Sequence, residues 1–127
     1  MWWRVVSTVM LLISVQPACA EDGSISLREW KALTSGKTIY YHLNGTYQGK
    51  EYYLPDDAFL VFMTPDGQCV EGVWAYADGR YCFSYGANFQ CFDHLRRGSR
   101  LFSRADTGGP EQEIKRIVDE PLSCSPG

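Results

Sequence analysis

Short apolar and aromatic runs alternate with turn signals along most of the chain after residue 36. Asp66-Gly67, Asp78-Gly79 and Gly86-Ala87 each separate two runs that have the length of β-strands. Asp-Gly pairs and pairs that begin with Gly favour the tight turns of β-hairpins. The pattern therefore predicts an all-β protein, an antiparallel β-barrel or curved meander of about seven or eight strands.

Two-residue turns determine which residues face one another across each hairpin. The Asp78-Gly79 turn places Trp74 opposite Phe83, and the Asp66-Gly67 turn would place Phe59 opposite Trp74. Pro65 could lengthen the first turn and shift that register, so the second pairing stays open. One face of the sheet would carry an aromatic row that could line a ligand site: Phe59, Trp74, Tyr76, Tyr81, Phe83 and Tyr85.

Four cysteines follow residue 20, and four cysteines allow three pairings. The Gly86-Ala87 turn sets Cys82 directly opposite Cys91 at a closely spaced position, which predicts a disulfide. That choice leaves Cys69 with Cys124, a bond that would tie the C-terminal tail to the central strands. In an exported chain, disulfides are favoured over metal binding or catalysis for such a set.

A short helix is expected before the first strand. Ser26 and Glu29 match a capping box, and Ser35-Gly36 suits the helix end. An apolar stripe of Leu27, Trp30 and Leu33 needs a surface to cover. We expect this helix to act as a lid across one end of the sheet.

The remaining segments extend the sheet. β-forming residues lie at 38–43, 46–47 and 51–54, and segment 58–64 is apolar on both faces. Such a strand is covered on both sides, and the helix stripe is the candidate cover. Residues 111–118 suit a last strand, with a helix as the alternative.

Five tyrosines cluster in the first strands: Tyr40, Tyr41, Tyr47, Tyr52 and Tyr53. They could stack on a sugar ring, but packing on a half-buried strand surface explains them more simply.

Residues 1–20 have the pattern of a secretory signal peptide. Arg4 precedes an apolar run at 5–15, and Ala18-Cys19-Ala20 resembles a cleavage site. A lipoprotein acylated at Cys19 is the less favoured alternative. The apolar run is too short to span a bilayer, so no transmembrane segment is expected. We expect a periplasmic or secreted protein with one domain over residues 21–127.

The formal charge is −3, from 12 basic and 15 acidic residues, and removal of Arg4 with the signal would make it −4. An acidic chain gives no support for nucleic acid as a partner. One basic cluster could bind an anionic group: Arg96, Arg97, Arg100 and Arg104. A solvated strand and turn is the simpler interpretation.

Motifs for catalysis, metals and cofactors are not found. His42 and His94 have no metal-ligand spacing, and each is interpreted as an ordinary surface or strand histidine. Asp56-Asp57 follows a proline and reads first as a turn. We expect no cofactor, no metal and no enzymatic activity, although a site built from scattered residues would escape sequence analysis.

Several short motifs resemble a domain-of-unknown-function family of small exported proteins from alphaproteobacteria. They are Gly36-Lys37-Thr38, residues 51–56, Gly72-Val73-Trp74, residues 78–83, Cys91 and an ending from Ile114 to Pro121. This chain departs from that pattern by carrying Cys69 and Cys124, and by Asp119-Glu120 at an expected turn. The resemblance implies an envelope location and a barrel-like fold, and it supplies no catalytic residues.

Two functions fit these features. The first is a non-enzymatic periplasmic binding module for a small apolar or glycan ligand, held by the aromatic row. The alternative is an interaction or inhibitor domain that acts on an envelope enzyme through a loop or the arginine strand. A cavity large enough for a ligand would favour the first, and a filled core with a protruding rigid loop would favour the second.

Overall fold

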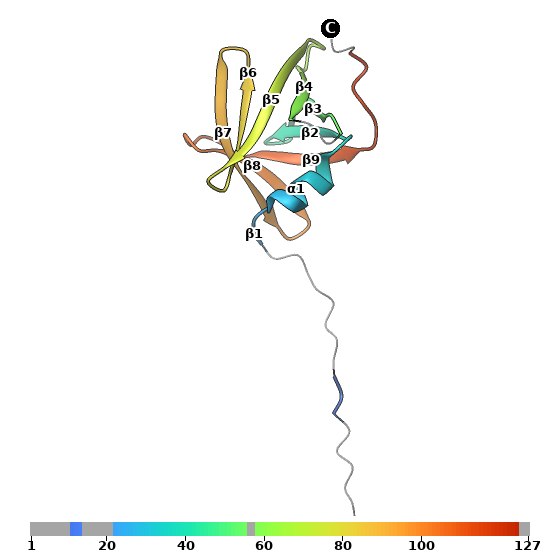
Figure 1. Cartoon of the computed structure of the whole chain (residues 1–127), viewed down its shortest axis with the longest axis vertical. Coiled ribbons are helices and arrows are strands. Elements are labelled where there is room, and N and C mark those ends of the chain that lie inside the picture. The colour runs from blue at the N-terminus through green and yellow to red at the C-terminus, as the bar shows by residue number, and fades with distance from the viewer. Residues whose placement is uncertain (1–10, 14–21, 56–57, 125–127) are drawn as a thin grey trace, which may run out of the picture.

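The computed structural model describes residues 11–13, 22–55 and 58–124. Within them, eight antiparallel strands follow one another in sequence order, and the last pairs with the first to close a barrel (Figure 1). The strands are β2 Thr38–Leu43, β3 Thr46–Tyr53, β4 Phe59–Met63, β5 Cys69–Ala77, β6 Arg80–Tyr85, β7 Asn88–Arg97, β8 Arg100–Ala105 and β9 Gln112–Val118. A two-residue strand, β1 Gly23–Ser24, pairs with the C-terminal half of β7.

The predicted barrel is therefore confirmed, and the segment that could have been a helix is strand β9. Most of the expected signal peptide and the Asp56-Asp57 turn lie outside the described residues. No helix in the described part of the chain has the length and apolar content needed to cross a membrane.

Two hairpins have the predicted register. The β5–β6 turn has positive φ at Asp78 (52°) and Gly79 (78°), as an Asp-Gly hairpin requires. Trp74 lies opposite Phe83, as predicted. In the next hairpin Cys82 lies opposite Cys91, and the two form a disulfide. The turn residues thus determine both the strand pairing and the first disulfide.

The β4–β5 hairpin has a different register from the one that a two-residue turn predicts. Its loop is longer, because the Thr64 amide donates to the Gln68 carbonyl oxygen at 2.8 Å. Phe59 consequently pairs with Val73 rather than with Trp74. A one-residue shift moves a side chain to the other face of a sheet, so Phe59 lies on the outside of the barrel and is 54% exposed.

Helix α1, Leu27–Thr34, closes one end of the barrel (Figure 1). The Ser26 hydroxyl caps it by accepting from the Glu29 amide at 3.2 Å. Trp30 is fully buried, with its ring centroid 3.8 Å from that of His94 and 5.4 Å from that of Tyr81. The predicted lid is confirmed, and Trp30 is the side chain that it inserts into the barrel.

The C-terminal tail covers the outside of the barrel. The Thr38 hydroxyl on β2 donates to the Glu120 carbonyl oxygen at 2.6 Å, and Cys124 forms the second disulfide with Cys69 on β5. The tail therefore crosses the outer faces of β3 and β4, where Val61 is buried, and Leu122 of the tail is buried as well. The expectation that the helix covers the outer face of segment 58–64 is wrong, because the tail lies there.

The two disulfides should contribute differently to stability, because they close loops of different length. Cys69 and Cys124 are 55 residues apart, whereas Cys82 and Cys91 are nine apart. Chain-entropy arguments give about 4 kcal/mol for the long loop and about 2–3 kcal/mol for the short one. We expect the C69S/C124S variant to lose more free energy of unfolding in guanidinium titrations than C82S/C91S. Equal losses, or the reverse order, would contradict a tail that acts as a structural clamp.

Candidate functional site at the open end of the barrel

The end of the barrel opposite α1 contains a cavity of about 550 Å³. The strand ends and hairpin loops at residues 44–45, 64–68 and 86–87 surround this open end. Four phenylalanine rings line the cavity: Phe62, Phe83, Phe92 and the largely exposed Phe89. Its polar lining residues are Tyr41, Glu51, Tyr85, Asn88, Gln90, Ser103 and Gln112. Apolar rings combined with convergent polar groups are the usual composition of a small-molecule site.

Glu51 is the central polar group of this cavity. It lies on β3, points into the barrel and is 4% exposed. Its Oε1 atom accepts hydrogen bonds from the hydroxyls of Tyr41 at 2.8 Å and Tyr53 at 2.7 Å. Its Oε2 atom accepts a short hydrogen bond from the Tyr85 hydroxyl. Because Tyr85 belongs to β6, this cluster links two sides of the barrel through its interior.

Burial determines the ionisation of the cluster. Burial raises the pKa of Glu51, while the hydrogen bonds from Tyr85, Tyr53 and Tyr41 lower it again. Burial, and next the charge of Glu51, raise the pKa values of Tyr41, Tyr53 and Tyr85 above their ordinary range. The three phenols therefore remain protonated donors. Such donors favour the ionised form of the carboxyl group, but burial outweighs them, and the pKa of Glu51 stays above its ordinary value.

Two glycines make room for the rings around this carboxylate. A Cβ atom on Gly72 would lie 2.5 Å from the Tyr85 ring and 2.7 Å from the Ser84 carbonyl oxygen. A Cβ atom on Gly49 would lie 2.5 Å from the Phe62 ring. Phe62 and Tyr85 meet edge to face with centroids 6.1 Å apart. The absence of side chains at these positions shapes one wall of the cavity.

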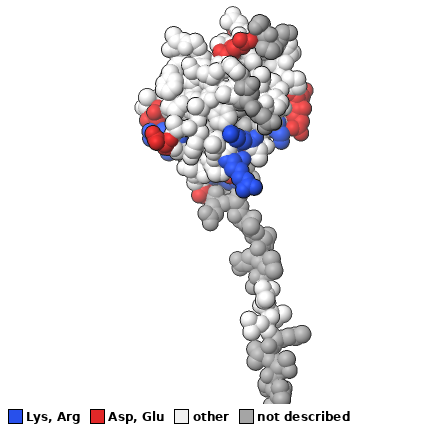
Figure 2. Space-filling view, in the orientation of Figure 1, with Lys and Arg blue, Asp and Glu red and all other residues white. Residues whose placement is uncertain are grey.

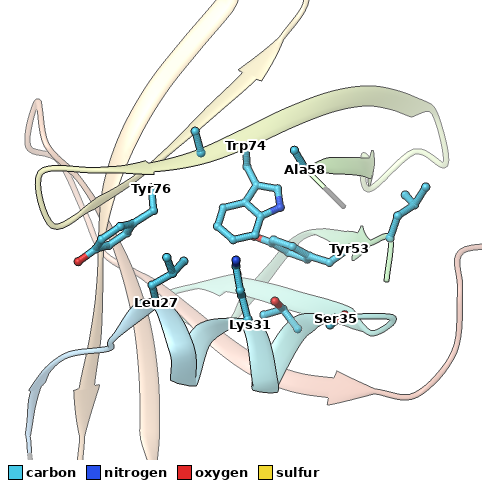
Figure 3. A pocket seen from close by; sticks show the side chains of 10 residues that line it. Leu27, Lys31, Ser35, Tyr53, Ala58, Trp74 and Tyr76 are labelled. Carbon is cyan, nitrogen blue, oxygen red and sulfur yellow. The ribbon is translucent and has the colours of Figure 1, made fainter. Parts of the chain in front are cut away.

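A second hollow of about 420 Å³ lies beside α1. Trp74, Tyr53 and Tyr76 line it, and Lys31 of α1 extends toward the Trp74 indole (Figure 3). Among the described residues its lining contains no buried carboxylate, and the hydroxyl of its buried Tyr53 donates to Glu51 of the open-end cavity. We therefore take the open end as the candidate site.

The structure separates the six residues of the predicted aromatic row. Phe83 and Tyr85 line the open-end cavity. Trp74 and Tyr76 line the hollow beside α1, and Tyr81 is buried in the core. Phe59 faces outward because of the register shift described above.

Sequence analysis missed Glu51, Tyr41 and Tyr53 as site residues, although it noted the tyrosine cluster. A signal was present: Gly49, Glu51 and Tyr53 alternate along one strand, and alternate residues share one face of a sheet. Nothing in the sequence shows that this face is the interior. That information comes from closure of the barrel and from the bulge in the β2–β3 pairing between Tyr41 and His42.

The four arginines proposed as an anion site each pair with a carboxylate of this chain. Arg97 binds Glu111 through two hydrogen bonds, and Arg100 binds Glu113 in the same way. Arg104 pairs with Asp93 at 3.4 Å, and Arg96 pairs with Glu29 of α1. An external anion would have to displace these partners. Figure 2 shows acidic and basic side chains next to one another at the left edge of one face of the barrel.

His94 is a strand histidine, one of the two predicted alternatives, but it lies on β7 in the core beneath α1 and is 1% exposed rather than at the surface. Its ring stacks on Tyr81 with centroids 4.3 Å apart. Neither ring nitrogen has a hydrogen-bond partner among the described residues. Burial lowers the pKa of His94 to about 3. In the described part of the chain, no group of three His, Cys, Asp or Glu residues could hold a metal ion.

Comparison with known proteins gives no match: no family model, no curated protein and no solved structure is similar to this chain. The resemblance to an exported alphaproteobacterial family therefore stays a prediction, and the site is interpreted from its own geometry.

Replacement of Gly72 by alanine tests the packing of the cavity wall. The new methyl group must displace the Tyr85 ring or the β6 backbone, and overpacking of this kind costs about 1–3 kcal/mol. We expect a loss of that size in the free energy of unfolding, measured by denaturant titration. The control is Glu71→Ala, an exposed neighbour on the same strand, which should change stability by less than about 0.5 kcal/mol. Wild-type stability in G72A would contradict the close approach of Tyr85.

His94 should make the protein less stable as the pH falls below about 6.5. Between that value and about 3, the unfolded chain carries a proton on this ring that the folded protein excludes. Each pH unit within the window then costs up to about 1.4 kcal/mol. The slope of the free energy of unfolding against pH should be shallower in His94→Phe. Carboxylates titrate alike in both proteins, so the difference between the two slopes comes from His94. Identical slopes would show that the folded protein does accept the proton.

Proposed function

We propose that this chain is an exported, non-enzymatic binding module that holds a small, largely apolar ligand in the open end of its barrel. The observation that carries this proposal is the cavity of about 550 Å³, lined by four phenylalanine rings with the Glu51 cluster at its polar side. The phenylalanine rings favour a ligand with an apolar body.

Export to the periplasm or the cell exterior is part of the proposal. Two disulfides fit an oxidising compartment, since such bonds persist where thiols are not kept reduced. The signal pattern at residues 1–20 supports the same location.

Binding is favoured over the interaction or inhibitor alternative for two reasons. The interior is hollow at one end rather than filled. The arginines that would contact a partner enzyme are already paired with carboxylates of their own chain.

Partial blocking of the barrel mouth tests the location. Prodan, a neutral apolar fluorophore, should bind the wild-type protein with a blue-shifted emission. Ala87 lines the open end in the β6–β7 turn, so Ala87→Trp should weaken prodan binding about tenfold or more, a loss of roughly 1.4 kcal/mol. Ala77 is also exposed but lies next to the β5–β6 turn at the helix end, and Ala77→Trp serves as the matched control with unchanged affinity. Failure of prodan to bind, or equal effects of the two substitutions, would contradict a site at the open end.

A further inference from the structure

Glu51 is the only buried carboxylate among the described residues, and no cation of the chain accompanies it. All eight ion pairs of the described residues involve other carboxylates, none of them buried. Removing a charged group from water is unfavourable unless hydrogen bonds and an opposite charge compensate for it. The tyrosines supply the hydrogen bonds, and the opposite charge is missing.

The hydrogen-bond geometry leaves this carboxylate one free acceptor position. An ionised carboxylate offers about four lone-pair positions on its two oxygens. The Oε1 atom accepts from two phenols, whereas Oε2 accepts only from Tyr85. Glu51 and Tyr85 both line the cavity, so the free position belongs to a carboxylate that borders the ligand space.

The aromatic walls add a second preference for positive charge. The faces of aromatic rings attract cations, and the attraction grows where water is excluded. Phe62, Phe83 and Tyr85 surround the same side of the cavity as Glu51. Phenyl rings combined with one desolvated carboxylate therefore complement an organic cation better than a neutral or anionic molecule.

We propose that the ligand of the open-end cavity is a small amine with an apolar body, whose protonated nitrogen donates to the Oε2 atom of Glu51. This proposal rests on the proposed function, since it names the chemical class that the same cavity takes. The ammonium group supplies the charge that the chain lacks at this position. The apolar body fills the space between the phenylalanine rings.

Three probes of nearly equal size test the charge preference: phenethylamine, phenethyl alcohol and phenylacetate. Their affinities are measured by calorimetry or by displacement of prodan at neutral pH. We expect the amine to bind about tenfold or more tightly than the alcohol, and phenylacetate to bind most weakly. Glu51→Gln keeps the shape of the side chain and should remove the gap between amine and alcohol. Glu71→Gln removes the same charge from the exposed outer face of β5 and should keep the gap.

The outcomes separate the two proposals. Equal affinities for amine and alcohol in the wild-type protein would overturn the amine assignment and leave a neutral binding site. A gap that survives in E51Q would also overturn it, because the preference would then arise from the overall negative charge. No binding of prodan or of any probe would overturn the binding function itself.

If E51Q does not fold, the amine assignment is tested on the wild-type protein alone. Nuclear Overhauser contacts between the methylene protons next to the ammonium group and the rings of Tyr85 and Phe62 would support the assignment. Contacts confined to Trp74 and Tyr76 would place the amine in the hollow beside α1 and overturn it.

Discussion

The arrangement of side chains inside this barrel depends on the hydrogen bonds that hold one carboxyl group away from water. Glu51 accepts hydrogen bonds from tyrosines on the neighbouring strands β2 and β3 and on β6, which lies three strands from β3 in the barrel. Hydrogen bonds to a buried charge are among the stronger ones in proteins, and loss of one leaves the charge exposed to an apolar surrounding. The cluster thus fixes the distance across the open end, and the bare backbone at Gly49 and Gly72 gives the rings of this wall their space.

The two ends of the barrel have different physical roles. At the helix end Trp30, Tyr81 and His94 pack against one another in a buried core. At the other end the same lumen remains hollow, with aromatic walls around a carboxylate. The disulfide from Cys124 to Cys69 holds the tail across the outer strands, so the shell does not need the open end to be filled. A small barrel can in this way keep a cavity without losing its core.

Local sequence rules predicted the parts of this fold that local geometry controls. Asp78-Gly79 and Gly86-Ala87 specify tight turns, and the register that follows from them brings Cys82 to Cys91. Pro65 lies in the β4–β5 loop, which is longer than a two-residue turn. The resulting shift of one residue was enough to move Phe59 from the expected interior to the surface. The site could not be predicted in the same way, because Glu51 and Tyr85 meet only after barrel closure places β3 and β6 across one lumen. Before that closure is known, a glutamate between a lysine and a tyrosine in a strand has the pattern of an exposed surface residue.

Native mass spectrometry of the protein purified from its own host tests the central claim most directly. The same sample is measured again after denaturation without reduction, so that the mass of any bound molecule and the disulfide bonds are determined from one sample. The account predicts both disulfides and a reproducible extra mass that leaves on denaturation and contains a basic nitrogen. A bare chain, or a bound molecule that is acidic, would contradict a cavity built around an uncompensated carboxylate.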